Sequence, residues 1–347
     1  MTHLLVDVDS KIPNLALMKI SQYVKDKGRT LLRLNEALRE RPLDLDPEKV
    51  WISCVFTWNR KFAQEWASHW RVPVEIGGSG ISLKTRLPDE IEQLIPDYDL
   101  YGDDRAIGFA QRGCIRKCSF CIVPLKEGRL IDNQYHPLEQ WVPEGFSKVL
   151  LLDNEFAACP YEQQVLETCQ AHDWKLSITQ GYDLRCVTEQ KAGWLADWKP
   201  WNLGFTRRTL YCAWDYLGIE PYVRKGIDLL QSAGFRGSEI MCYCLVGFNT
   251  SHLQDYYRFH VLWKEYGVLP FLMRYNKRTD DRFLNALSRF VNRGPAIYRY
   301  HSFIQYCEQE APSLLRETTE IVNTVESGQP IPLDIPYQMP QMKSQYD

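Results

Sequence analysis

Long hydrophobic runs are absent from this chain. No apolar segment approaches the roughly 18 residues of a membrane-spanning helix, and residues 1–7 contain no basic segment ahead of an apolar stretch. Because secretory signal peptides have that arrangement, we expect a cytoplasmic protein that does not associate with membranes. An excess of one charge is also absent, since 41 Lys and Arg residues face 44 Asp and Glu residues. The composition therefore gives no indication of a strongly basic nucleic-acid-binding protein.

The 11 cysteines do not indicate a disulfide framework, because disulfides are rare in the cytoplasm. A close group of cysteines indicates a metal or redox site instead. Cys114, Cys118 and Cys121 form such a group, with the spacing C-x3-C-x2-C. The nearby Arg112 and Lys117 favour the thiolate form of these side chains.

Three thiolates on one short loop suit a [4Fe–4S] cluster, in which one iron then lacks a protein ligand. The amino and carboxylate groups of S-adenosylmethionine (SAM) can fill that position. Electron transfer into SAM would then form a 5′-deoxyadenosyl radical that abstracts hydrogen from a substrate. Two alternatives stay open. Zinc needs a fourth protein ligand, and a ferredoxin needs a fourth cysteine, for which Cys159 or Cys186 is available.

Strand and helix patterns alternate along the chain, which predicts an α/β fold with parallel strands. In a small Rossmann-like domain at residues 1–100, we expect strands at 4–8, 49–56 and 72–76, and helices at 13–28 and 60–70. After a linker at 98–104, we expect strands at residues 106–110, 148–152, 175–179, 202–206, 239–246 and 269–273. The helices between them are expected at residues 161–172, 188–197, 220–233 and 251–266. Six β/α units predict a partial TIM-like barrel at residues 101–310, followed at 311–347 by a helix and a flexible tail.

The cysteine segment resembles the signature of the radical SAM superfamily, C-x3-C-x-aromatic-C, with Phe120 as the aromatic residue. The resemblance implies a partial (β/α)6 barrel, one [4Fe–4S] cluster, SAM, and an electron donor such as flavodoxin or ferredoxin. The cysteines follow the first expected barrel strand, where barrels of this kind carry their chemistry. Residues 1–100 resemble the cobalamin-binding-type domain that precedes the barrel in several branches.

Cobalamin domains with a histidine ligand carry Asp-x-His-x-x-Gly after their first strand. Residues 7–13 of this chain read Asp-Val-Asp-Ser-Lys-Ile-Pro and contain no histidine, although Gly77 and Gly78 resemble a later glycine pair of that domain. We therefore expect a degenerate domain that binds no cobalamin. Methylthiotransferases have a similar layout but need further cysteines near the N-terminus, where this chain has only Cys54.

The SAM-binding Gly-Gly-Glu motif that often ends the second strand of this family is also incomplete. Its place is taken by Asp153, Asn154 and Glu155, of which Asn154 or Glu155 would accept hydrogen bonds from the SAM ammonium group. The alternative is a solvated acidic loop.

Three further residues are expected near SAM because each follows a predicted barrel strand. Arg185, after the third strand, suits a carboxylate, or else pairs with Asp183. Arg207, after the fourth, is a second candidate for the carboxylate, or else a surface arginine. Gly247, after the fifth, would let the backbone approach adenine, or else forms a tight turn into a helix.

The region 274–300 contains seven Arg and Lys residues, two Asp residues and five aromatic residues. This mixture suits a nucleotide or nucleic-acid base as the substrate. The alternative is an amphipathic helix at 283–291, with its aromatic residues in the core and its arginines in water. A peptide or small-metabolite substrate, and a non-catalytic iron–sulfur protein, are the other functions that we keep open.

Overall fold

The fold was analysed in a computed structural model that describes residues 2–28, 30–34, 46–198, 200–275 and 280–333. The density of contacts divides the chain into two units. The first contains the described residues up to Leu152 together with 172–174, and the second contains 153–171 and the described residues from Lys175 onward. Within the described segments, no helix has both the length and the apolar character to cross a bilayer.

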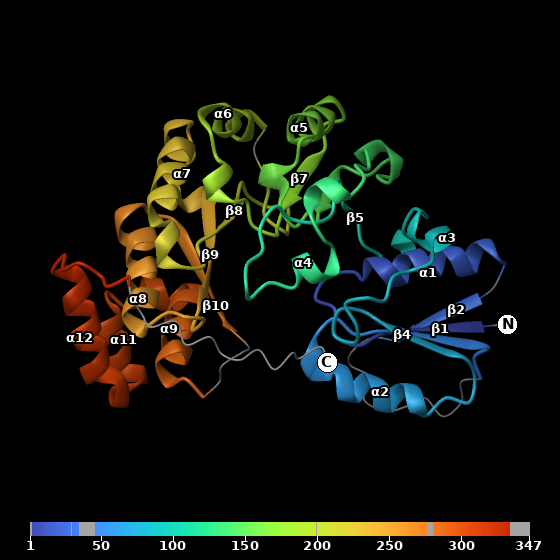
Figure 1. The fold of residues 1–347 in the computed structure, drawn as a ribbon, viewed down its shortest axis with the longest axis horizontal. Helices are drawn as coiled ribbons and strands as arrows, with labels where there is room; N and C mark the ends of the chain where they lie inside the picture. Colours follow the sequence, from blue (N-terminus) through green and yellow to red (C-terminus); the bar gives the residue numbers. More distant parts are fainter. Residues whose placement is uncertain (1, 29, 35–45, 199, 276–279, 334–347) are drawn as a thin grey trace. The chain divides into compact units, whose positions relative to one another are not determined.

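A four-stranded parallel sheet forms the start of the first unit (Figure 1). Its order is β2-β1-β3-β4, and the strands are β1 (Thr2–Asp7), β2 (Thr30–Leu34), β3 (Lys49–Ser53) and β4 (Val74–Gly77). Helices α1 (Leu15–Asp26) and α2 (Arg60–Ser68) cover opposite faces of this sheet. The three predicted strands and both helices of this region are confirmed, whereas β2 was missed.

Successive side chains of a strand point to opposite faces of the sheet, which explains why helices pack on both faces. In the parallel register Leu5 lies beside Trp51, and both pack against the apolar stripe of α1. The intervening residues point the other way, so that Val6 and Ile52 pack with Trp66 of α2. The sheet is therefore buried on both faces, as the Rossmann-like interpretation requires.

The first unit continues with short elements around a long loop. These are α3 (Asp89–Glu92), β5 (Arg105–Gly108), α4 (Val123–Lys126) and β6 (Lys148–Leu151). Strands β5 and β6 pair in parallel, which confirms the strands predicted there. The phenol of Tyr98 accepts a hydrogen bond from the Ile107 amide at 3.1 Å, so the segment predicted as a linker is tied to β5.

The second unit repeats the strand–helix alternation. Its strands are β7 (Lys175–Ile178), β8 (Leu210–Ala213), β9 (Ile240–Val246) and β10 (Leu269–Arg274), and the last three form a parallel sheet in the order β10-β9-β8. A parallel bridge between Tyr182 and Cys212 connects the segment after β7 to β8. The helices between the strands are α5 (Glu162–Ala171), α6 (Glu189–Trp198), α7 (Glu220–Ser232) and α8 (His252–His260), which a π-helical turn (Val261–Glu265) extends.

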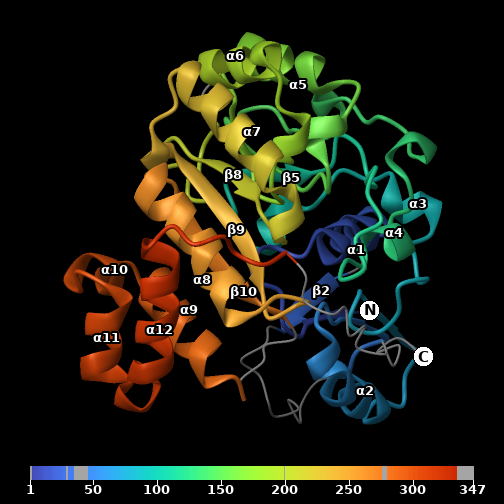
Figure 2. The same ribbon diagram turned by 60° about the vertical axis from the view of Figure 1, so that its left-hand side comes forward.

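In the described residues after β10, the chain forms four more α-helices. They are α9 (Arg282–Asn292), α10 (Gly294–Arg299), α11 (Phe303–Glu310) and α12 (Leu315–Glu326). Figure 2 shows α9 beside β10, and α11 and α12 next to α8 and α9. The predicted helices at 283–291 and 312–325 are confirmed, whereas α10 and α11 were missed; residues 334–347 of the predicted tail lie outside the described residues.

The strand predicted at residues 202–206 is wrong. These residues form a turn in which the Asn202 carboxamide oxygen accepts from the Thr206 and Arg207 amides at 2.8 and 3.3 Å. An Asn side chain that bonds its own turn competes with strand pairing. The strand that follows α6 is instead β8. The α/β class with parallel strands is confirmed, and the partial barrel stays a prediction.

Candidate functional site

The three signature cysteines lie on the loop between β5 and α4 in the first unit, and all are partly exposed. The Arg116 amide donates to the Cys114 sulfur at 3.2 Å, and the Val123 amide donates to the Cys121 sulfur at 3.5 Å. Amide donors stabilise a thiolate over a thiol, and hydrogen bonds of this kind also adjust the potential of iron–sulfur clusters. The donor set and its surroundings therefore fit a cluster held by thiolates.

The backbone that follows the cysteines folds back and holds the start of the loop. The Cys114 amide donates to the Gly128 carbonyl at 3.3 Å. Gly113 has a φ of +91°, and a Cβ there would lie 2.8 Å from the carbonyl atoms of Arg129. The Asn133 carboxamide donates to the Arg129 carbonyl at 2.8 Å and so fixes the returning segment. The loop has a defined path that requires glycine immediately before the first cysteine.

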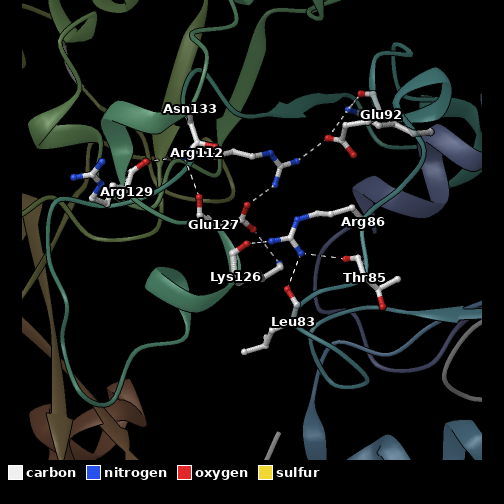
Figure 3. Close-up of polar contacts among 10 residues, drawn as sticks. Leu83, Thr85, Arg86, Glu92, Arg112, Lys126, Glu127, Arg129 and Asn133 are labelled. Atoms are coloured by element: carbon white, nitrogen blue, oxygen red, sulfur yellow. Dashed lines mark hydrogen bonds and ion pairs between the residues drawn. The ribbon is translucent and has the colours of Figure 1, made fainter.

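Arg112, two residues before the first cysteine, connects the loop to two carboxylates (Figure 3). Its guanidinium donates to Glu92 at the end of α3 at 2.9 Å and to Glu127 after α4 at 3.3 Å. It also lies 3.9 Å above the Phe109 ring, and Lys19 of α1 pairs with the same Glu92 carboxylate at 3.1 Å. The charge of Arg112 is thus shared with carboxylates, and the side chain anchors the loop.

A second contact in Figure 3 comes from Arg86, in the segment between β4 and α3. Its guanidinium donates to the Leu83 carbonyl at 2.7 Å and also to the Lys126 carbonyl at the end of α4. Lys126 in turn pairs with Glu127 at 3.3 Å. Within the first unit, the two ends of the cysteine loop are therefore fixed by the same polar network.

The second unit contains its own group of reactive side chains. Ligand atoms of Glu155, Asp183 and Cys186 all lie within 4.8 Å of one another. The Asp183 carboxylate accepts from the Arg185 amide at 2.9 Å and from its guanidinium at 2.8 Å. The pairing of Arg185 with Asp183 is the alternative left open by the sequence. Two carboxylates, a thiol and a guanidinium give this group partners for both the ammonium and the carboxylate of an amino acid.

A buried network holds the loop that carries Asp183. The Tyr182 hydroxyl donates to Glu162 of α5 at 2.5 Å, and Lys191 of α6 donates to the other oxygen of Glu162 at 2.6 Å. Burial raises the pKa of the Glu162 carboxyl, whereas Lys191 and Tyr182 lower it. The Tyr182 side chain, next to Asp183, is thus hydrogen-bonded to α5, and Lys191 links the same Glu162 carboxylate to α6.

The corrected position of β8 changes one site prediction. Arg207 lies on the exposed turn before β8, so its expected place after the fourth strand is wrong. The first charged residue after β8 is Asp215, two residues beyond the end of the strand, and its carboxylate accepts from the Leu245 amide at 3.3 Å. Burial raises the pKa of the Asp215 carboxyl, while Arg258 and Arg185 lower it. The sequence signal for this residue was the uninterrupted apolar run Leu210–Ala213.

Gly247 follows β9 directly, as expected, with a φ of +74°. Its amide donates to the Asp255 carboxylate at 3.0 Å and to the Thr250 hydroxyl at 3.2 Å. The Ser251 hydroxyl then accepts from the Gln254 amide at 3.2 Å and caps α8. The interpretation as a tight turn is confirmed, and the contact with adenine stays a prediction.

Seven of the cysteines are buried: Cys54, Cys159, Cys169, Cys212, Cys242, Cys244 and Cys307. Burial raises the pKa of the Cys54 and Cys159 thiols to about 12, so both are protonated at neutral pH.

The edge of the first sheet where a cofactor would meet β1 and β3 is filled by the chain itself. The Asp9 carboxylate accepts from the Val55 and Phe56 amides at 2.7 and 3.0 Å. A Cβ at Gly78 would lie 2.3 Å from the Cys54 carbonyl oxygen, so this glycine serves close backbone packing. Asp9 and Gly78 therefore hold the loops after β1, β3 and β4 together, and the expectation that this domain binds no cobalamin stays a prediction.

Comparison of the chain with protein-family models, with curated proteins and with solved structures gives no match.

Proposed function

We propose that this protein is a cytoplasmic radical SAM enzyme whose cluster is held by Cys114, Cys118 and Cys121. The observation that carries the proposal is the loop itself, where three partly exposed sulfurs lie within eight residues. The amide donors to Cys114 and Cys121 support thiolate ligation. When bound, a [4Fe–4S] cluster supplies the electron that cleaves SAM reductively to a 5′-deoxyadenosyl radical.

The proposal includes the partial (β/α)6 barrel that the sequence predicts at residues 101–310. Asn154, Glu155 and Arg185 bind the amino and carboxylate groups of SAM, because carboxylate and carboxamide oxygens accept from ammonium and a guanidinium binds a carboxylate. Phe120, the aromatic residue of the signature, would contact the cluster, and Gly247, directly after β9, would allow adenine to approach the backbone. A flavodoxin or ferredoxin supplies the electron.

The test is anaerobic reconstitution of the full chain with iron and sulfide, followed by reduction and addition of SAM. We expect about four irons per chain, as in a [4Fe–4S] cluster, and release of 5′-deoxyadenosine. Iron binding without 5′-deoxyadenosine would instead identify a non-catalytic iron–sulfur protein. Cys118→Ser should lose most of the iron, while Cys186→Ser, also partly exposed, should keep it. Equal iron loss in both variants contradicts the three-cysteine assignment.

The substrate of the proposed reaction is a nucleotide or a nucleic-acid base. The exposed arginines of the region 274–300 support this choice over a peptide or a small metabolite, whereas Phe283 and Phe290 of the same region are buried and do not contribute to it. A mass change in RNA, DNA or peptides from cells that carry the gene, compared with cells that lack it, distinguishes these classes.

A further inference from the structure

An open pocket of about 720 Å³ lies between β10 and α9 in the second unit. Its volume is in the range of small-molecule sites. The side chains that carry the argument are Phe271, Arg274, Asn285, Ser288, Arg289 and Arg293. The pocket belongs to neither the cysteine loop nor the group around Asp183.

Among the residues that the structure describes, three arginines and no acidic residue line this pocket. The Arg274 guanidinium donates to the Asn285 carboxamide oxygen, which fixes its direction. Arg289 and Arg293 lie one helical turn apart and are exposed, and in the described part of the chain neither has an acidic partner. The pocket therefore carries an excess of positive charge, and planar guanidinium groups match the oxygens of a phosphate.

A buried hydroxyl provides a second, independent observation. Ser288 is 8% exposed, and its oxygen has no hydrogen-bond partner within the described residues. A buried polar group without a partner is unfavourable. Because Ser288 lines the pocket, rotation of its side chain toward the pocket would let an oxygen of a bound ligand supply the missing bond. The nearby Asn292 side chain offers no partner to Ser288 because it bonds both the amide and the carbonyl of Leu272 at 2.9 Å.

The wall formed by β10 adds an aromatic surface. Phe271 is 37% exposed and lines the pocket, and its ring meets Tyr243 edge-on at 5.9 Å. In contrast, Phe283 and Phe290 of α9 are buried, as the amphipathic-helix alternative predicted. An exposed ring beside unpaired arginines is the combination that binds a nucleotide through its base and its phosphate.

We propose that this pocket binds the phosphate of a nucleotide between Arg289, Arg293 and Ser288, with the base against Phe271. This assignment deepens the proposed function by naming where the substrate is held, and its identification as substrate rests on that function. Binding itself needs neither SAM nor a cluster. A failure to bind nucleotide is thus distinguishable from a failure to cleave SAM.

The experiment is calorimetric titration of the full chain with nucleoside monophosphates, the matching nucleosides, inorganic phosphate and a short single-stranded oligonucleotide. We expect saturable binding of a monophosphate and at least about tenfold weaker binding of its nucleoside, because charged hydrogen bonds to the phosphate are lost. Preference for the oligonucleotide would identify a nucleic-acid strand as the source of the phosphate. Binding of inorganic phosphate alone, or of nucleoside and nucleotide equally, would overturn the proposal.

Variants on one helix provide the control. Arg289→Gln and Arg293→Gln should each raise the Kd about tenfold, whereas Arg282→Gln should leave it unchanged, because Arg282 bonds Ser313 and does not line the pocket. Ser288→Ala should weaken binding without lowering the melting temperature, since it removes an unsatisfied hydroxyl. Equal weakening by Arg282→Gln and Arg289→Gln would reduce the effect to net charge and refute the site.

Discussion

Arg112 and Glu92 form an ion pair of 2.9 Å that joins the beginning of the cysteine loop to the end of α3. Both side chains are partly exposed, at 27% and 40%. Solvent screening keeps such a pair weak, so Arg112→Gln should lower the free energy of unfolding by only about 1 kcal/mol. The larger expected effect is slower or incomplete iron loading, because the loop loses its anchor.

The matched control is Arg129→Gln, which removes a cation from the same loop that pairs with the exposed Asp132. We expect this variant to load iron as the wild type does. Iron content and urea unfolding of both proteins check the prediction. Identical iron loading of the two variants would mean that Arg112 has no positioning role.

Alanine substitutions at two glycines of the same loop distinguish the effect of backbone strain on stability from that of steric overlap. Gly113 and Gly128 both have positive φ, at +91° and +75°, so alanine is strained by about 1–2 kcal/mol at either position. Only at Gly113 would the new Cβ overlap backbone, which adds about 1–3 kcal/mol. Urea denaturation should therefore rank Gly113→Ala below Gly128→Ala in stability. The reverse order would contradict the path described for the loop.

The pair of Asp255 and Arg258 in α8 is buried completely, at 0% exposure on both sides. Arg258 also donates to the carbonyls of Trp214 and Leu245, which ties α8 to the ends of β8 and β9. Asp255→Asn removes the carboxylate that is paired with the buried Arg258 guanidinium and leaves only the more distant charge of Asp215 nearby, so it should reduce stability by about 3 kcal/mol. Arg316→Gln, which breaks an exposed pair with Glu320, should change stability by less than about 1 kcal/mol. Chemical denaturation of both variants measures the contrast.

The raised pKa of His252 leads to a prediction of how the free energy of unfolding depends on pH. Burial lowers the pKa of the His252 side chain. The carboxylates of Asp281 and Glu317, at 3.1 and 2.6 Å, raise the pKa by more than burial lowers it, so the net pKa is above the ordinary value. A raised pKa means that the stabilisation is complete below the unfolded-state pKa of about 6.5 and is lost as the pH rises through the folded-state pKa.

Melting temperatures at pH 6 and pH 9 test whether the stabilisation by His252 decreases as the pH rises. His252→Asn should be less stable than the wild type at pH 6, and the difference should shrink at pH 9. Glu317→Gln removes one of the two carboxylates and should show a smaller pH dependence than the wild type. A difference between His252→Asn and wild type that grows with pH would contradict the assignment.

Where apolar residues repeated regularly, the sequence was sufficient to predict the elements. The buried run of β1 and the helical stripe of α1 identified both elements, although Asn14 starts the helix after Pro13 by accepting from the Leu17 amide. Strand β2 (Thr30–Leu34) was missed. The short helix α3 (Asp89–Glu92) was missed because four residues show no helical period.

The candidate site was predictable only where one segment carries it. The three cysteines lie within eight residues of one another, so the sequence alone was sufficient to predict that they lie on one loop. The group of Glu155, Asp183 and Cys186 unites residues separated along the chain, so only the fold brings their ligand atoms within 4.8 Å. Asp215 was missed because the turn at Asn202 was taken for the strand, which displaced the expected carboxyl end.

The division of the cysteines into buried and partly exposed thiols determines which of them can react with reagents in the cell. Seven of the eleven cysteines are buried, so peroxide, alkylating reagents and loosely held iron reach only Cys114, Cys118, Cys121 and Cys186. Under the proposed function, delivered iron would meet three partly exposed cysteines on one loop, while the buried thiols would stay out of its reach. The same exposure makes that group the first part of the chain that oxygen damages when iron is missing.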